Sequence, residues 1–170
     1  MTLAAPAGRI QLLTAAFLAL AMAGTVGTAL GFEHIGGFIP CALCLEQRIP
    51  YYIGAPLMAA AALAGWLNAP GMVTRLLLLA GAGLMAWGLV LGVYHSGVEW
   101  HWWEGPATCA TSADAVTKDA GSLLGDLSSK KPPSCDAAAL RVLGLSFAGW
   151  NVLASAALAA IALRAAMIRR

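Results

Sequence analysis

The chain has 170 residues, of which 60% are hydrophobic and only 11% are charged, and its formal net charge is +2. With a mean hydropathy of +0.77, this composition is too apolar for a soluble globular domain and predicts an integral membrane protein. The lipid bilayer is therefore an expected partner, and no nucleic-acid partner is expected.

Charged side chains are segregated along the chain, which leaves four long runs without Asp, Glu, Lys or Arg. Each run is long enough to cross a bilayer as a helix, so we expect an all-α membrane protein whose single domain, residues 1–170, is a bundle of four transmembrane helices. The first run is too long for the core of a signal peptide, and the chain continues to span after it. The predicted spans are 10–31, 49–67, 76–94 and 142–163, with outer loops at about 32–48 and 95–141.

Basic residues predict the orientation of these spans. Five arginines lie close to span ends on one side, where no acidic residue accompanies them, and this side is expected to be cytoplasmic. The other side has as many basic residues, but three of them lie inside a long loop, where they count less. Both termini are thus predicted inside, and both loops outside, where disulfides persist. The inner arginines are Arg9, Arg75, Arg164, Arg169 and Arg170, and the outer basic residues are Arg48, Lys118, Lys130, Lys131 and Arg141.

The first outer loop ends in the sequence Pro-Cys-Ala-Leu-Cys-Leu-Glu-Gln-Arg, residues 40–48. Two cysteines with two residues between them can close a small disulfide ring that exchanges readily with an attacking thiolate. Arg48 follows Cys44 by four residues, which in a helix is about one turn, and its charge would favour a thiolate on Cys44. Pro50 suggests that the regular helix begins near residue 49, which makes this spacing approximate. Cys41 and Cys44 are therefore predicted to be a redox-active pair with Arg48 beside them.

Aromatic residues and one histidine mark the outer ends of the second and third spans. Tyr51 and Tyr52 are interpreted as members of an interfacial aromatic belt. The third span closes on Tyr-His-Ser-Gly-Val-Glu-Trp, residues 94–100, and the topology puts His95 level with the cysteine pair. His95 is a candidate for hydrogen bonding or proton transfer, although an interfacial or solvating role explains it equally well.

The second outer loop contains Cys109 and Cys135 and, between them, a pattern typical of a helix. Four apolar residues in this stretch fall on one stripe, and we expect a short amphipathic helix that lies on the membrane surface. Together the four cysteines of the chain allow three disulfide connectivities or one tetrathiolate zinc site. Zinc usually requires a second close pair, which 109 and 135 do not supply, so no metal site is predicted. The apolar stripe consists of Val116, Ala120, Leu123 and Leu127.

The sequence allows two other classes of function, a structural scaffold and a haem protein. A non-enzymatic scaffold whose loops are cross-linked would explain the disulfides, but a structural disulfide does not require two cysteines so close together beside an arginine. A haem protein would need facing histidines inside the spans, whereas His34, His95 and His101 all lie at or outside the outer surface. Redox chemistry at the membrane surface is therefore the favoured hypothesis.

Several stretches together resemble the DsbB family of disulfide-bond-formation proteins. They are the 40–48 motif after a first span, the 94–100 sequence, Gly-Pro-Ala-Thr-Cys at 105–109 and Ser-Cys-Asp at 134–136. The resemblance implies an enzyme of a bacterial inner membrane, a protein-dithiol:quinone oxidoreductase that reoxidises a periplasmic thioredoxin-fold protein similar to DsbA and reduces a membrane quinone, ubiquinone or menaquinone. One departure is Gln47, where some members carry an acid directly before the arginine, and this changes the local charge balance.

The resemblance also implies roles for the individual residues. The partner's thiolate would attack a disulfide between Cys109 and Cys135 at Cys109, and the freed Cys135 would attack Cys41. Cys44 would then be left as a thiolate that can add to the quinone ring. Arg48 would stabilise negative charge on the thiolate and the reduced quinone, and His95 would contact a quinone oxygen or supply a proton. A relative that is dedicated to one substrate or one partner has the same residues and is the alternative.

Overall fold

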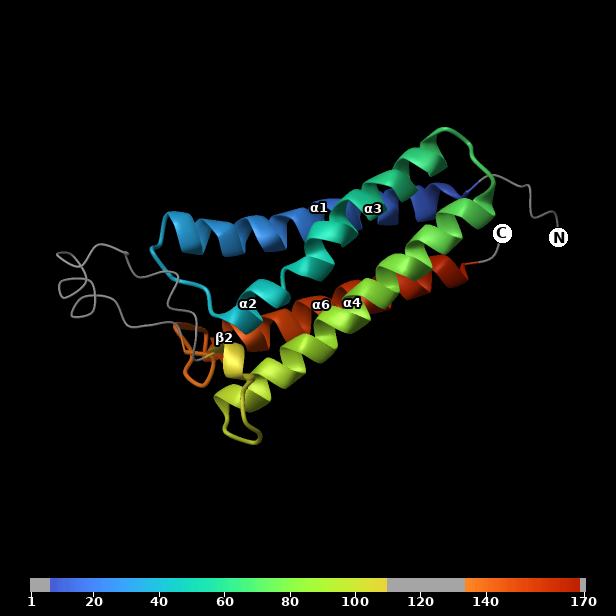
Figure 1. Ribbon diagram of the computed structural model, residues 1–170. Helices are drawn as coiled ribbons and strands as arrows, with labels where there is room; N and C mark the ends of the chain where they lie inside the picture. Colours follow the sequence, from blue (N-terminus) through green and yellow to red (C-terminus); the bar gives the residue numbers. More distant parts are fainter. Residues whose placement is uncertain (1–6, 110–133, 169–170) are drawn as a thin grey trace.

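The computed structural model describes residues 7–109 and 134–168. In this part of the chain, four helical segments are long and apolar enough to cross a membrane, and they run in alternating directions through one bundle (Figure 1). The predicted all-α, four-span architecture is therefore confirmed, whereas the predicted amphipathic helix at 116–127 lies outside the described residues. The spans are α1 (Arg9–His34), α3 (Ile49–Trp66), which the short α2 (Ala42–Glu46) precedes, α4 (Gly71–Glu99) and α6 (Phe147–Met167).

The bundle is held together by apolar side chains that meet between the helices. Helix α1 packs on α3, α3 packs on α4, and α4 packs on α6. Fully buried leucine and methionine side chains fill the space between them, and apolar contact of this kind stabilises a helix bundle in lipid through close packing. The largest of these buried side chains are Leu18, Met22, Met58, Leu78 and Met85.

Two glycines of α4 let α6 approach closely on the outer half of the bundle. A Cβ atom at Gly88 would lie 3.0 Å from the Ser155 hydroxyl oxygen, and one at Gly92 would lie 3.0 Å from the Asn151 amide nitrogen. Small residues at such positions allow polar side chains to reach partners across a helix interface. The two glycines therefore make room for Asn151 and Ser155 inside the bundle.

The inner end of the bundle gathers the start of α1, the end of α6 and the turn between α3 and α4 (Figure 1). Here Gln11 Nε2 donates to the Ala165 carbonyl at 3.2 Å, and Arg75 Nε donates to the Ala166 carbonyl at 3.0 Å. These bonds supply donors to carbonyl groups in the last turn of α6, where a helix makes fewer hydrogen bonds of its own. The cysteines lie at the opposite, outer end.

Helix α4 is longer than the sequence predicted, since it runs from Gly71 to Glu99 rather than from 76 to 94. The prediction ended the span at charged or titratable residues, but both ends continue past them. Arg75 is accommodated because it binds a carbonyl of α6, and His95 is accommodated because its ring has polar contacts inside the protein. The extra outer turn carries His95 into the site.

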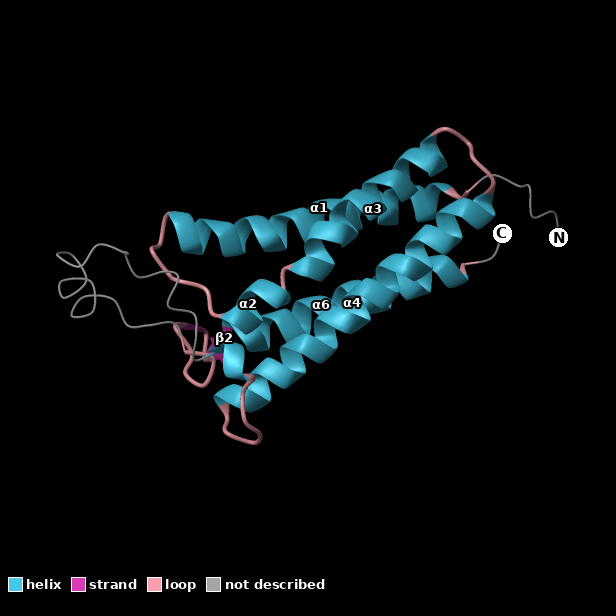
Figure 2. Ribbon diagram, in the orientation of Figure 1, coloured by secondary structure: helices cyan, strands magenta, loops and turns pink. Residues whose placement is uncertain are grey.

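The last span begins at Phe147, five residues later than predicted, because a small hairpin occupies the start of the charge-free run. Strands β1 (Arg141–Val142) and β2 (Leu145–Ser146) are antiparallel, and Figure 2 shows them in magenta. The two residues between them, Leu143 and Gly144, have φ angles of 52° and 85°, as a two-residue turn with a primed geometry requires. Ser146 then caps α6, since its hydroxyl oxygen accepts from the Gly149 amide at 3.2 Å.

Candidate redox site

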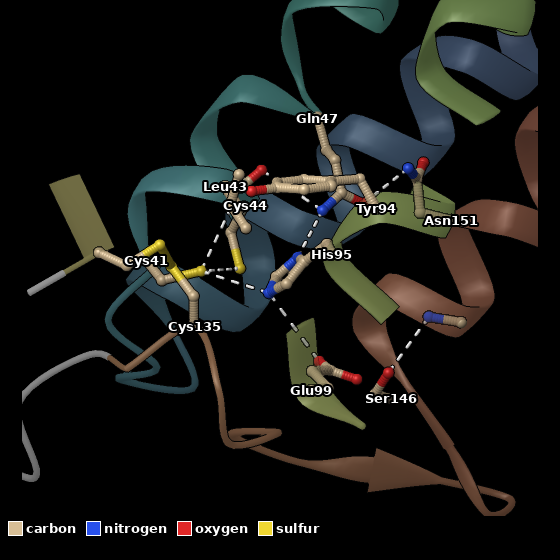
Figure 3. A network of polar contacts seen from close by, with 12 residues as sticks. Cys41, Leu43, Cys44, Gln47, Tyr94, His95, Glu99, Cys135, Ser146 and Asn151 are labelled. Atoms are coloured by element: carbon tan, nitrogen blue, oxygen red, sulfur yellow. Dashed lines mark hydrogen bonds and ion pairs between the residues drawn. A yellow bond between two sulfur atoms is a disulfide. The ribbon is translucent and has the colours of Figure 1, made fainter. Parts of the chain in front are cut away.

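All four cysteines gather at the outer end of the bundle in one cluster, which we call the sulfur cluster. Cys41 and Cys135 are 4% and 2% exposed and form its buried centre with Leu43 and Val98, while Cys44 and Cys109 pack against them. Figure 3 shows the Cys135 sulfur next to the Cys41–Cys44 pair. The structure therefore brings together two pairs of cysteines that are far apart in the sequence.

Cys41 and Cys44 are free thiols held face to face by the short helix α2. Cys41 is the N-cap of this helix, and its sulfur accepts from the Cys44 backbone amide at 3.3 Å. The same geometry turns the Cys44 side chain toward it, so that the two sulfur atoms are 2.8 Å apart. Because the chain makes one helical turn after Cys41, two residues between the cysteines are enough to bring the sulfur atoms within reach of each other, as a disulfide between them requires.

The electrostatics of the pair differ from the sequence-based expectation. The hydrogen bond from the Cys44 thiol lowers the pKa of the Cys41 thiol from 9.0 to about 5, and a contact from His95 acts in the same direction while burial opposes both. The lowered pKa favours a thiolate on Cys41 of the reduced pair, whereas the Cys44–Arg48 spacing favours one on Cys44. The reason is that the closest donor to either sulfur is the other thiol, and the Arg48 guanidinium is engaged with an acidic side chain.

Cys109 and Cys135 form a disulfide. Cys109 closes the short 3₁₀ helix η1 (Ala107–Cys109) and is half-buried, while Cys135 is 2% exposed. This bond uses two of the four thiols that a tetrathiolate zinc site would need. An external thiol can reach the sulfur of Cys109 more easily than that of Cys135.

Arg48 lies in an ion pair with Glu33, and both side chains line a cavity. Glu33 is in the last turn of α1, and its side chain is 25% exposed. Arg48 directly precedes α3, and its side chain is 12% exposed. The cavity has a volume of about 480 Å³ and also includes Cys44 and Gln47 in its wall. The rest of its lining is mainly apolar and aromatic, with Phe32, Phe38, Val142, Phe147 and Trp150 among its residues.

His95 contacts the cysteine pair from helix α4. Its side chain is buried on α4, with Nε2 at 3.7 Å from the Cys41 sulfur and at 4.0 Å from a Glu99 carboxylate oxygen. The level of His95 relative to the cysteines is the one that the topology predicted. The ring does not itself line the cavity, but it contacts Gln47, whose side chain does.

Four further polar residues near the site were not found from the sequence. Tyr51 is only 3% exposed, and its hydroxyl donates to Asn151 Oδ1 at 2.7 Å. The interpretation of Tyr51 as an interfacial anchor is therefore wrong, whereas Tyr52 is 48% exposed. Asn151 in turn contacts Gln47. An asparagine inside an otherwise apolar span was the available signal, because such a residue usually has a partner inside the bundle. The overlooked residues are Gln47, Tyr51, Asn151 and Ser155.

Comparison with known protein families gives one match. The model described as "Disulfide bond formation protein DsbB" matches residues 11–165, which is nearly the whole chain and includes all four cysteines. No curated protein and no solved structure matches the chain significantly.

Proposed function

Because this chain belongs to the DsbB family of membrane proteins for disulfide bond formation, we propose that it reoxidises a periplasmic thioredoxin-fold dithiol protein, similar to DsbA, and reduces a membrane quinone. The observation that carries this proposal is the position of Cys44. Its side chain packs against the sulfur cluster and also lines the apolar cavity that contains Arg48. One residue thus connects the place where disulfides exchange with the place where a quinone would bind.

Exchange begins at Cys109 in this proposal. A partner thiolate attacks the Cys109 sulfur, and the Cys109–Cys135 bond breaks to release Cys135 as a thiolate. Cys135 then attacks Cys41 of an oxidised Cys41–Cys44 pair and frees Cys44, and the second partner thiol resolves the mixed disulfide with Cys109 and releases Cys109 as a thiolate. Cys109 finally attacks Cys135 in the Cys41–Cys135 disulfide, which closes the Cys109–Cys135 bond again and releases Cys41. The partner loses two electrons and two protons, and the Cys41–Cys44 pair gains them. The described arrangement, with one disulfide and two thiols, corresponds to the stage at which the electrons have reached the first pair.

The residues around the cavity suit a quinone. Its volume of about 480 Å³ and its mainly apolar wall with few polar groups are typical of sites for small apolar ligands. When bound, ubiquinone or menaquinone supplies an acceptor for two electrons and two protons. The forked guanidinium of Arg48 can donate to a carbonyl oxygen of such a ring, and Glu33 holds this guanidinium at the wall. Once Cys41 is engaged in a mixed disulfide, it no longer accepts from Cys44, and the Cys44 sulfur is free to react.

The proposed activity predicts a defined stoichiometry. When the purified protein is mixed anaerobically with a reduced thioredoxin-fold partner and a quinone, we expect the quinone absorbance to disappear and one partner disulfide to form for each quinone reduced. The Cys41→Ala/Cys44→Ala double variant, which keeps the second disulfide, should show neither change. A stapled scaffold would leave both quinone and partner unchanged with the wild-type protein, and this result would rule out the proposal. A protein dedicated to one partner would discriminate strongly among several thioredoxin-fold dithiols.

We also propose that the sulfur cluster faces the periplasm and that both termini are cytoplasmic. Arg9 begins α1, Arg75 lies near the start of α4, and Arg164 is in the last turn of α6. These helix ends lie at the end of the bundle opposite the short helix α2 (Figure 1), and arginines close to span ends favour the cytoplasmic side. Arg169, Arg170, Lys118, Lys130 and Lys131 lie outside the described residues. In spheroplasts treated with a reductant, a membrane-impermeant maleimide should label the cysteines. Labelling that requires lysis of the inner membrane would show the opposite orientation.

A further inference from the structure

A chain of buried polar side chains leads from the sulfur cluster into the bundle (Figure 3). Gln47 and His95 are 7% and 3% exposed, and the Gln47 side-chain nitrogen lies 2.5 Å from His95 Nδ1. On its other side, the Gln47 side-chain oxygen accepts from Asn151 Nδ2 at 2.7 Å. The mechanism proposed above gives Gln47 no role, although it contacts the His95 ring, whose Nε2 lies 3.7 Å from the Cys41 sulfur.

Two backbone carbonyls fix the orientation of both amides. A carbonyl oxygen can only accept a hydrogen bond, so the amide atom that faces it must be the nitrogen. Asn151 Nδ2 faces the Gly88 carbonyl at 3.2 Å, and Gln47 Nε2 faces the Leu43 carbonyl at 3.3 Å. The hydroxyl of Tyr51 donates to Asn151 Oδ1 at 2.7 Å, which agrees with this orientation.

The orientation of Gln47 determines where His95 carries its proton. An amide –NH₂ group only donates, so His95 Nδ1 must accept from it and cannot itself be protonated. A neutral imidazole has one N–H group, which is therefore at Nε2, the nitrogen that lies 3.7 Å from the Cys41 sulfur. We propose that Gln47 is a positioning residue that holds His95 neutral with its proton on Nε2, so that the ring donates to the Cys41 thiolate.

Protonation of the ring is opposed by the same contact. An imidazolium carries protons on both nitrogens, and its Nδ1–H would point at the Gln47 –NH₂ group at 2.5 Å. Turning the Gln47 amide over would relieve that clash, but it would set two nitrogens against each other at Asn151 and two oxygens against each other at Leu43. The charged or titratable groups that face the ring are Cys41, Cys44 and, from its own helix, Glu99. Glu99 favours a cationic ring, and the Gln47 donor opposes it.

The arrangement also decides whether the site suits a metal ion. The Cys41 and Cys44 sulfurs and a ring nitrogen of His95 lie within 4.8 Å of one another, as they would around zinc. A neutral ring that binds a metal ion through Nε2 must carry its proton on Nδ1, and the Gln47 –NH₂ group faces Nδ1 at 2.5 Å. We therefore assign His95 as a hydrogen-bond donor to sulfur.

The position of the ring proton can be measured directly by nitrogen NMR of the reduced protein labelled at histidine. The resonances of His95 are identified by their absence in His95→Gln. At neutral pH we expect Nδ1 to be unprotonated and Nε2 to be protonated. In Gln47→Glu a carboxylate replaces the donor, and both ring nitrogens should be protonated at the same pH. A protonated Nδ1 in the wild-type protein, or an unchanged ring in Gln47→Glu, would overturn the proposal.

A second readout uses the thiolate itself. The alkylation rate of Cys41 by iodoacetamide should fall in the wild-type protein as the pH is lowered through the pKa of this thiol, which the hydrogen bond from Cys44 lowers. In Gln47→Glu the ring becomes a cation beside the thiolate, and the midpoint should move down by roughly half a pH unit; a midpoint that rises would contradict the proposal. Glu46→Gln, a change of equal size at the exposed neighbouring residue, is the control and should leave both readouts unchanged.

If Gln47→Glu does not fold, Gln47→Met tests the same point, because it removes the donor and keeps the length of the side chain. Without the donor, part of the His95 population should carry its proton on Nδ1 in the nitrogen NMR spectrum, and an Nδ1 that stays unprotonated as in the wild-type protein would overturn the proposal. The inference rests on the proposed function only for the redox role of Cys41. Since neither readout uses partner or quinone, a failed quinone assay and a misassigned ring proton give separate results.

Discussion

Replacing Cys109 with serine is expected to lower oxidation of a thioredoxin-fold partner to roughly one per cent or less of the wild-type rate, because it removes the sulfur that an external thiolate attacks. Cys109 is half-buried in its disulfide with Cys135, whereas Cys135 is 2% exposed and packs beside Cys41. The remaining Cys135 thiol is too deep for the partner to reach. The rate is measured as formation of the partner's disulfide under excess quinone.

The same variant contains its own control. Cys41 and Cys44 are untouched in Cys109→Ser, so a small dithiol such as dithiothreitol should still reduce their disulfide and support slow reduction of quinone. Circular dichroism and the elution volume of the purified protein check that the bundle is intact. If quinone reduction with the small dithiol is lost as well, the Cys109–Cys135 pair is needed for more than accepting electrons from the partner, and the proposed separate roles of the two cysteine pairs are wrong.

The spans could be predicted because a helix that crosses lipid needs a long run of residues without charge. The exact ends of the spans could not be predicted in this way. Long runs without charge predict four helices. A lack of charge cannot, however, distinguish a helix from the hairpin at Leu143 and Gly144, where two residues with positive φ angles reverse the chain. Nor does a titratable residue end a helix when its neighbours satisfy it. His95 continues α4 because Gln47 and Cys41 provide its contacts, and these come from a different part of the chain.

The candidate site was predictable where chemistry depends on local spacing. A pair of cysteines with two residues between them, an arginine close behind and a histidine at the same membrane depth are all visible in the sequence. The contacts that set their charge are not, because they depend on how the helices are rotated against each other. Glu33 reaches Arg48 from α1, and Asn151 reaches Gln47 from α6 across 104 positions in sequence. Local spacing reveals neither the carboxylate that engages the Arg48 guanidinium nor the amide that fixes the side chain of Gln47.

Replacing Arg48 separates the effect of its charge from that of its geometry. Arg48→Lys keeps a cation and loses the planar fork, and Arg48→Met keeps a similar apolar length without charge. If charge dominates, Lys should retain much of the activity and Met little; if forked hydrogen bonding to a quinone oxygen dominates, both should be poor and the quinone KM should rise in each. For Met we expect a loss of about 1 to 3 kcal/mol, as for charge-assisted hydrogen bonds. This corresponds to roughly five-fold to a hundred-fold in kcat/KM.

Glu33→Gln is the matched control, because Arg48 also forms an ion pair with Glu33 at the wall of the cavity. Removing the carboxylate releases the guanidinium from its position at the wall without removing its charge, so Glu33→Gln should impair the quinone kinetics less than Arg48→Met does if Arg48 acts on the quinone. If Arg48 serves only to hold α1 against the start of α3, Glu33→Gln and Arg48→Met should lower thermal stability alike. Quinone kinetics that stay at the wild-type level in a folded Arg48→Met would remove Arg48 from the site and leave the ion pair as its role.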